Sequence, residues 1–327
     1  MRNSLSRQTI RRTLCAALAC FVMPMALAWT NKPVRILVPA PAGGTMDVFA
    51  RLIADQLAIE IGQPVVVDNK PGAGGAIAVQ AMRAAAPDGQ TLMITASNVL
   101  TEIPHVMKTN FDPLKDVRPV AIVARAGMVL VGSPNLPAKD LKGLISYLKA
   151  NPGKFSFASY STGTSSQYAG MIFNQKAGLD LQHVPFPGSP PALTQVIGGQ
   201  IPIMFDGIVT SKSMIASGHL QAYGVAAKTR SPQLPDVPTM AEQGYPDINF
   251  SNWLGVVATS SVPNDLVEKI HAAVARVAAQ PKVKERMMAS GFDPADDQPP
   301  AQLAQAVRDE HTRNAAIVKA FNIQFNQ

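Results

Sequence analysis

The chain has 327 residues, of which 47% are hydrophobic, and its 29 basic and 22 acidic side chains give a formal net charge of +7 at pH 7. This length allows two domains and a core large enough to fold without cross-links. The positive charge is small and dispersed along the chain, which argues against a nucleic-acid or membrane-surface partner.

The first 28 residues are typical of an export signal. An apolar run over residues 14–27 contains Pro24 and is too short to span a membrane. Ala26-Leu27-Ala28 fits a small-residue cleavage site. We therefore expect export to the periplasm with cleavage near Ala28, which would remove four arginines and reduce the formal charge from +7 to +3: Arg2, Arg7, Arg11 and Arg12.

Two alternatives concern the same segment. Arg11-Arg12 could belong to a twin-arginine signal, and Cys20 could mark a lipoprotein. Both cysteines of the chain, Cys15 and Cys20, lie here, so cleavage would leave no disulfide, thiol nucleophile or cysteine metal ligand. The exported protein must then be held together by its hydrophobic core.

The strongest structural signal begins at residue 34. Residues 34–38 form a short, mostly apolar run that predicts a buried strand, and Gly43-Gly44 allow a tight turn. Thr45 is an N-cap residue type, Asp47 falls in the first helical turn, and apolar residues follow at helical spacing. A strand, a glycine turn and a helix start together direct free backbone N–H groups at one point, which favours an anion.

The same pattern continues to residue 98. A strand at 65–67 is followed by a glycine-rich loop at 69–75 and an alanine-rich helix to about Ala86. A third strand at 91–94 ends in the polar segment 95–98. These elements predict a βαβαβ unit with a parallel sheet.

A second βαβαβ unit is predicted over residues 155–207. Its expected strands are 155–158, 183–186 and 201–205, with helices ending near Lys176 and Ile197. Small, polar or glycine-rich residues again follow the strands. Because open α/β sheets bind ligands at the carboxyl ends of their strands, two such lobes facing each other would enclose a ligand in the cleft between them.

The remainder of the chain is expected to return to the first lobe. Residues 231–246 are proline-rich and connective, 253–258 predict a strand, and helices are expected over 263–280 and 300–320. We therefore predict a two-segment hinge. The expected first lobe comprises residues 29–130 and 248–327, and the expected second lobe comprises residues 131–247.

An enzyme is the main alternative class, and the motifs disfavour it. The 72–77 loop has Ile77 in place of the last glycine of a dinucleotide motif, and no GK[ST] phosphate loop is present. Ser165 is not in a GxSxG turn. The five histidines are scattered without metal-ligand spacing. We therefore expect no catalytic site, no metal and no cofactor.

Several segments in order carry a specific family resemblance over essentially the whole exported chain. They are PAPAGGTMD at 39–47 with Ala50-Arg51, NKPGAGG at 69–75, PDGQTL at 87–92, GGQ at 198–200, and LPDVPT at 234–239 with Glu242 and Gly244. This series resembles the substrate-binding receptors of tripartite tricarboxylate transporters, the Bordetella-uptake-gene family.

The resemblance implies a periplasmic binding protein type II fold that closes on a small organic acid and delivers it to membrane permease subunits. We expect this acid to be a mono- or dicarboxylate, aliphatic or aromatic. A monomer is expected. Receptors of this kind hold carboxylates with backbone N–H groups and water. By matching position, the implied ligand-binding residues are Ala42, Gly43, Gly44, Thr45, Asp47, Asn69, Gly74, Gly75, Ser97, Asn98, Ser159, Gly163, Thr164, Ser165, Pro191, Ala192 and Asp206.

The chain departs from the family pattern at three positions. Gln167 stands where family members often have histidine, Pro187 where lysine is common, and Gln195 where an acidic residue is usual. The ligand of another family member therefore cannot be assigned to this chain. Asp47 could rigidify its loop instead of touching ligand, and Asp206 could simply hold its loop. A receptor of the same fold that signals to a membrane sensor kinase would share all these features, so the sequence leaves that alternative open.

Overall fold

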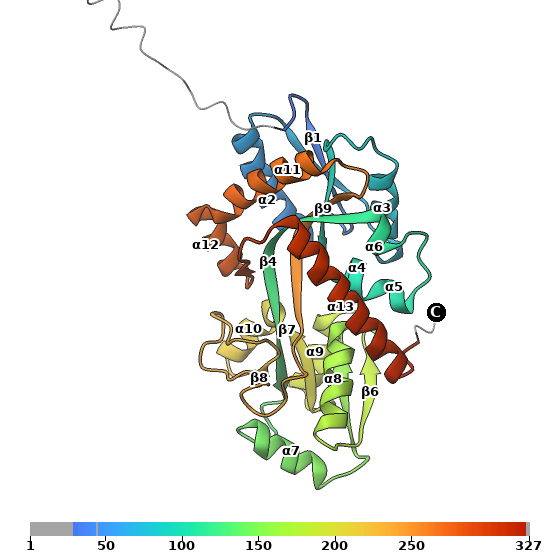
Figure 1. Ribbon diagram of the computed structural model, residues 1–327. Helices are drawn as coiled ribbons and strands as arrows, with labels where there is room; N and C mark the ends of the chain where they lie inside the picture. The colour runs from blue at the N-terminus through green and yellow to red at the C-terminus, as the bar shows by residue number, and fades with distance from the viewer. Residues whose placement is uncertain (1–28, 44, 325–327) are drawn as a thin grey trace, which may run out of the picture.

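The structure is a computed structural model that describes residues 29–43 and 45–324. The predicted export signal at 1–28 therefore lies outside the described residues. Across the described part, every helix is too short or too polar for a membrane span. The chain forms two α/β lobes, the first above and the second below in Figure 1.

The first lobe is built on the predicted βαβαβ unit. Strand β1 (Val34–Val38) lies between β2 (Val65–Asn69) and β3 (Thr91–Ala96) and is parallel to both, which confirms the expected parallel sheet. Helix α2 (Thr45–Ile61) connects β1 to β2. The 3₁₀ turn η1 (Ala73–Gly75) and helix α3 (Ala76–Arg83) connect β2 to β3, and α3 ends earlier than the predicted Ala86.

Alternation along β1 explains why helices cover both faces of this sheet. Ile36 packs in one core with Ile53 and Leu57 of α2, whereas the intervening Leu37 packs in another core with Val79 of α3. Three short helices, α4 (Asn98–Thr101), α5 (Ile103–Val106) and α6 (Pro113–Asp116), follow β3.

A long strand to which the sequence analysis assigned no element joins the two lobes. β4 (Val117–Gly132) pairs with β9 (Ser251–Thr259) through residues 117–127. Through residues 128–132 it pairs instead with β7 (Ile203–Gly207) and β8 (Gln221–Val225). One strand is therefore shared by both sheets (Figure 1).

The second lobe repeats the parallel arrangement. β5 (Phe155–Ser159) is parallel to β6 (Leu181–Pro185) on one side and to β7 on the other. Phe157 packs in one core with Phe173 of α8, and Ala158 in another with Leu193 of α9. The lobe's helices are α7 (Leu141–Lys149), α8 (Ser165–Lys176), α9 (Ser189–Ile197) and α10 (Ile208–Ala216).

The chain crosses between the sheets twice, and the two crossings lie side by side. Gly127 of β4 pairs with Ser251 of β9, and the Phe250 N–H donates to Ala226 O at 2.8 Å. The pairing thus changes sheet close to the predicted boundaries at 130/131 and 247/248. Those boundaries remain a prediction, as does motion about a hinge.

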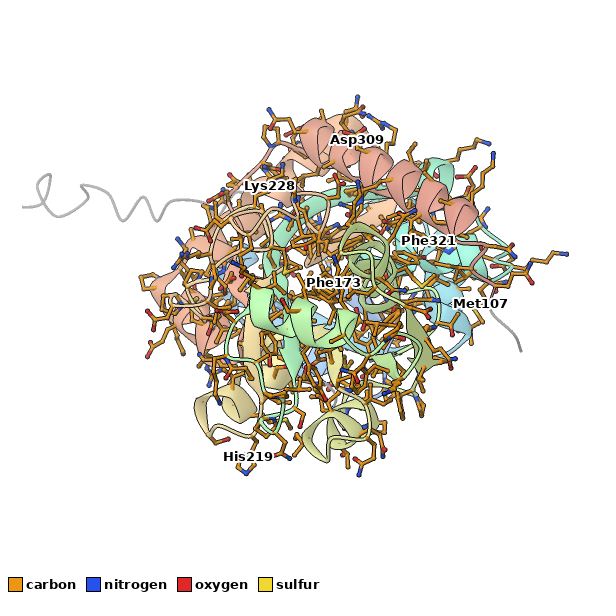
Figure 2. The ribbon with its side chains drawn as sticks, turned by 90° about the horizontal axis from the view of Figure 1, so that it is seen from below. Met107, Phe173, His219, Lys228, Asp309 and Phe321 are labelled. Atoms are coloured by element: carbon orange, nitrogen blue, oxygen red, sulfur yellow. The ribbon has the colours of Figure 1, made fainter. Side chains whose placement is uncertain are left out.

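The C-terminal segment covers the first lobe and then reaches the second. It comprises α11 (Asn264–Ala279), α12 (Pro281–Ala289), the short β10 (Asp293–Pro294) and α13 (Pro300–Ala320). Helix α13 contributes Leu303 to a first-lobe core but Ile317 to the main second-lobe core. Figure 1 shows α13 running obliquely from the first lobe to the second, and Figure 2 shows it along one edge of the molecule, between the labels of Asp309 and Phe321.

Candidate functional site

A cavity of about 380 Å³ lies where the two lobes meet. Its wall includes Ala96 at the end of β3, Tyr160 directly after β5, and Gly207 at the end of β7. The carboxyl ends of these strands therefore converge on one space, as expected for ligand sites in open α/β sheets. The other lining residues are Asn98, Glu102, Ala126, Gly188, Ser189, Val209, Thr210, Asn252 and Phe292.

The electrostatic character of this interlobe cavity is unusual for an anion site. Glu102 is an acid, and neither lysine nor arginine occurs among the described lining residues. The remaining polar lining groups are hydroxyls, side-chain amides and backbone. An anion held there would have to bind backbone N–H groups, neutral side chains and water.

A second, mainly apolar cavity of about 290 Å³ adjoins the first. The two share Val209 and Phe292 as wall residues. Gly43 of the predicted anion loop lines this second cavity, together with Phe49 and Leu52 of α2. The predicted first loop therefore lies next to the interlobe cavity, beyond the wall formed by Val209 and Phe292.

Asp47 ties the first loop to the second one. Its carboxylate accepts hydrogen bonds from the Gly43 N–H at 2.8 Å, from Arg51 Nε at 3.0 Å and from Asn69 Nδ2 at 3.0 Å. The Arg51 hydrogen bond, followed by the Gly43 N–H, lowers the pKa of Asp47 to about 2. Asn69 also donates to Ala40 O at 3.0 Å. Asp47 and Asn69 therefore fix the conformation of the two loops. This is the role that the sequence analysis gave as the alternative to ligand contact for Asp47.

The glycines of the second loop are required by the backbone and by close packing. Gly74 and Gly75 have φ values of +59° and +93°. A Cβ atom at Gly75 would lie 2.8 Å from Val99 Cγ1, and one at Gly74 would lie 2.7 Å from Ile103 Cγ2. Side chains at these positions would therefore displace α4 and α5, which follow β3.

In the second lobe, Gln167 and His183 organise the polar loop at 159–166, which follows the predicted strand at 155–158. The Gly163 N–H donates to Gln167 Oε1 at 2.7 Å, and Gln167 Nε2 lies 3.2 Å from His183 Nδ1. The Ser159 hydroxyl donates to Ser161 O and lies 2.7 Å from His183 Nε2, so the network assigns the ring proton to Nε2. Burial lowers the pKa of His183 to about 4, so this is a neutral structural histidine at pH 7.

Asp206 is fully buried behind the cavity wall. It accepts hydrogen bonds from the hydroxyls of Ser189 at 2.5 Å, Ser211 at 2.6 Å and Thr210. Burial raises the pKa of Asp206, and these hydroxyls oppose the rise. The carboxylate therefore fastens the starts of α9 and α10, and its hydroxyl partners Ser189 and Thr210 line the cavity.

Glu102 is a cavity residue that sequence reasoning missed. It is fully buried between α4 and α5, and its Oε1 accepts a hydrogen bond from the hydroxyl of Ser165 in the second lobe. Burial raises the pKa of Glu102 to about 7, while the Ser165 hydrogen bond opposes the rise. The available signal was its place shortly after the polar end of the third strand, at 95–98.

Further polar contacts surround Glu102 where the lobes meet. Asn252 Oδ1 accepts from the Ser97 hydroxyl at 3.4 Å and lies 3.2 Å from the oxygen of the Ser165 hydroxyl, whose proton goes to Glu102. Burial raises the pKa of Tyr160 well above its usual value, and the charge of Glu102 adds to the rise. Ser97 and Ser165, both predicted as ligand-binding residues, therefore support the cavity wall through Asn252.

The structure places the other predicted residues in different surroundings. Asn98 lines the interlobe cavity, whereas Ala192 is buried in the core beside Leu193 and Pro191 is half-buried in the same helix. The Thr164 hydroxyl donates to Ser161 O at 2.8 Å. Ala42 is exposed, Thr45 is the first residue of α2, and Gly44 is not described.

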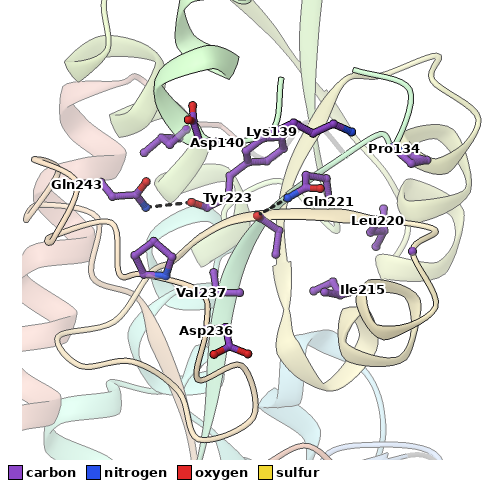
Figure 3. Close-up of a pocket in the computed structure, with 14 residues that line it drawn as sticks. Pro134, Lys139, Asp140, Ile215, Leu220, Gln221, Tyr223, Asp236, Val237 and Gln243 are labelled. Atoms are coloured by element: carbon purple, nitrogen blue, oxygen red, sulfur yellow. Dashed lines mark hydrogen bonds between the residues drawn. The ribbon is translucent and has the colours of Figure 1, made fainter. Parts of the chain in front are cut away.

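A larger cavity of about 650 Å³ lies at the far end of the second lobe (Figure 3). It is lined by Tyr223 and Gln221 of β8, by Lys139 and Asp140 before α7, and by Asp236. Strand β4 pairs with Gly207 at the carboxyl end of β7 and with Ile203 at its amino end. Pro134, which follows the β4 residues at that amino end, lines the larger cavity, so this cavity lies away from the carboxyl ends of the strands. Size therefore does not identify the functional cavity, because the strands' carboxyl ends converge elsewhere. Within the described ranges, no three His, Cys, Asp or Glu side chains form a group that could hold a metal ion.

The sequence also matches known proteins over nearly its full length. Residues 49–323 match the model of the tripartite tricarboxylate transporter family receptor. Protein BugT of Bordetella pertussis is 31% identical over 318 residues, covering 94% of this chain and 96% of BugT.

Two solved structures combine clear sequence identity with the same fold. A protein of R. palustris solved with adipate has a TM-score of 0.76 and 28% identity, covering 90% of this chain and 99% of that one. MatC from Rhodopseudomonas palustris with bound malate has a TM-score of 0.71 and 34% identity, covering 88% and 99%. These likenesses confirm the predicted periplasmic binding protein fold and the family resemblance. The chain belongs to the tripartite tricarboxylate transporter receptor family, whose members are solute-binding proteins.

Proposed function

We propose that this receptor is exported, captures a small organic carboxylate in the interlobe cavity, and delivers it to the membrane subunits of a tripartite permease. The observation that carries the proposal is the cavity of about 380 Å³ at the converging strand ends of two lobes. Relatives of the same fold were solved with malate and with adipate, which supports a carboxylate as the ligand class.

Helix starts supply the groups that would recognise the carboxylate. Helix α10 begins at Ile208 beside the interlobe cavity, and α2 begins at Thr45 beside the adjoining one. Helix α9 also begins beside the interlobe cavity, but Pro190 and Pro191 lack an N–H, so its first turn offers only the N–H groups of Ser189 and Ala192. The first N–H groups of a helix have no acceptor within the helix and carry partial positive charge. In the interlobe cavity, together with Asn98 and water, they would hold a carboxylate without a lysine or arginine, whereas the adjoining cavity is also lined by Arg286.

The hydrogen-bonded loops would keep this geometry ready for the ligand. Asp47 and Asn69 hold the first-lobe loops, Gln167 and His183 hold the 159–166 loop, and Asp206 holds the starts of α9 and α10. Side chains that are fixed before binding lose little conformational entropy when the ligand arrives. We infer that the predicted loop residues contribute mostly through backbone groups and loop shape.

A thermal-shift screen of short mono- and dicarboxylates tests the proposal. A ligand that binds the folded state alone raises the melting temperature by mass action, by about 2.7 kcal/mol of apparent stability at a hundredfold excess over Kd. We expect at least one carboxylate to raise the melting temperature while matched neutral alcohols do not. A screen in which no carboxylate has this effect would contradict the proposed function.

A further inference from the structure

Glu102 belongs to the first lobe but lies at the start of a second-lobe helix. Its Oε1 accepts from the hydroxyl of Ser165, the first residue of α8. The N-cap residue Thr164 makes no side-chain cap hydrogen bond, and its hydroxyl donates to Ser161 O. A carboxylate from the opposite lobe therefore stands where the positive end of the α8 dipole favours an anion.

This arrangement fills one anion position with the protein's own carboxylate. A ligand carboxylate at the α8 start would have to displace Glu102 or lie against it, and two carboxylates at one site repel each other. At the starts of α9 and α10 the carboxylate of Asp206 is buried behind the cavity wall, and the residues that line the cavity there are its hydroxyl partners Ser189 and Thr210. One ligand carboxylate fits the cavity better than two.

The second oxygen of Glu102 needs a hydrogen-bond donor. Within the described part of the chain, Oε2 is buried and has no hydrogen-bond partner, although Glu102 lines the cavity. The neighbouring ionisable groups do not supply one: Glu310 accepts from Thr101 and Trp253, and Arg313 donates to Asn249 O. A buried carboxylate oxygen left without a donor is costly, so a donor from the ligand would be favoured.

We propose that Glu102 determines specificity: the ligand is a monocarboxylate that also carries a hydroxyl or ammonium group, and this group donates to Glu102 Oε2. The inference rests on the proposed carboxylate-binding function and narrows it. Above about pH 7, where Glu102 is ionised, this excludes a simple dicarboxylate, because a second carboxylate would offer an acceptor where the cavity already presents one.

Titration calorimetry at pH 8 with acids matched in chain length tests this. The acids form one series at each chain length, with two, four, six or more carbons. Each series compares the unsubstituted acid, the ω-hydroxy acid, the ω-amino acid and the dicarboxylate. Succinate and adipate are the dicarboxylates of the four-carbon and six-carbon series. We expect the ω-hydroxy or the ω-amino acid of one length to bind at least tenfold more tightly than the other two. The two donor-bearing arms distinguish a hydroxyl ligand from an ammonium ligand.

Variants then assign the effect to Glu102. Glu102→Gln keeps the shape but its amide can donate to a carboxylate, so we expect the preference over the dicarboxylate to fall at least tenfold. Glu310→Gln is the matched control, because Glu310 is a nearby half-buried acid outside the cavity lining, and should leave the preference unchanged.

The outcomes separate this inference from the function on which it rests. If a dicarboxylate or an unsubstituted acid binds the wild-type protein as tightly as the donor-bearing acid of its length, or if Glu102→Gln leaves the preference intact, the inference is wrong and carboxylate binding stands. If no acid of any series binds, the inference is wrong; if no carboxylate of the thermal-shift screen binds either, the proposed function is wrong as well.

Discussion

Gly163 of the second lobe faces Val106 of the first so closely that a Cβ atom at position 163 would lie 2.5 Å from Val106 Cγ2. The lobes therefore touch beside the Glu102–Ser165 hydrogen bond. Gly163 also has a φ of +73°, which disfavours any other residue. A side chain at position 163 would therefore press against the first lobe.

Gly163→Ala should hold the lobes apart. Gly218→Ala is the matched control, because Gly218 has a φ of +74° and nothing within 4 Å of an added Cβ. Both variants should lose about 1–2 kcal/mol of stability from the backbone alone. Only Gly163→Ala should also weaken carboxylate binding, by tenfold or more, and enlarge the radius of gyration in small-angle scattering of the liganded protein. Equal behaviour of the two variants would mean that the Val106 contact has no part in closure.

Asp47 should stabilise the protein at neutral pH and lose this effect in acid. Its pKa is lowered from 3.8 to about 2, so the unfolded state binds more protons than the folded state between these values. The contribution is therefore full above about pH 4 and disappears as the pH falls through 2. Melting curves of the wild type and Asp47→Asn should differ at pH 7 and converge in strong acid. A difference that persists unchanged at pH 2 would contradict this assignment.

Glu102 should show the opposite pH dependence. Its pKa is raised from 4.5 to about 7, so the folded state holds the extra proton and the stabilisation is full below 4.5 and lost as the pH rises through 7. Between those limits the wild type should lose on the order of 3 kcal/mol relative to Glu102→Gln. Glu310 raises this pKa and Arg313 lowers it. Denaturant titrations from pH 4 to pH 8 measure the difference, and a constant difference would contradict the assignment.

Charge recognition should not depend on Lys70, the cation of the second predicted loop. Its ammonium lies 3.5 Å from Asp68, and its side chain is 41% exposed. We expect Lys70→Ala to cost less than about 1 kcal/mol of stability and to leave ligand affinity within threefold of the wild type. Converting the ligand's carboxylate to a methyl ester should instead abolish measurable binding. Loss of binding in Lys70→Ala would disprove recognition by backbone and neutral groups.

Local sequence patterns predicted the two βαβαβ units because each strand, turn and helix start in them is marked by residues that are neighbours in the sequence. Residues 34–38 and 155–158 are short apolar runs followed by turn residues, and β1 and β5 occur there. The 117–132 run was missed because Arg118, Pro119 and Arg125 interrupt its apolar pattern. It is nevertheless a strand, since β9 on one part and β7 and β8 on the other satisfy its backbone.

The candidate site was predictable only to the level of its loops. Short motifs identified the segments around Asp47 and Asn69, and the polar residues after a predicted strand identified the segment around Ser165, but neither showed which side chains line the cavity. Glu102 is a site residue because Ser165, 63 positions later, approaches it across the cleft. Likewise, the pairing of Gln167 with His183 depends on how α8 packs on β6. Such contacts arise from tertiary structure and leave no periodic signal in the sequence.

The central claim is that this receptor binds a small organic carboxylate without converting it. Calorimetric titration of the purified protein with its best thermal-shift ligand, followed by mass spectrometry of the recovered ligand, tests both halves of the claim. The account predicts one ligand bound per chain and recovery of that ligand unchanged. Steady conversion to a product, or the absence of a saturable signal for every carboxylate, would contradict it.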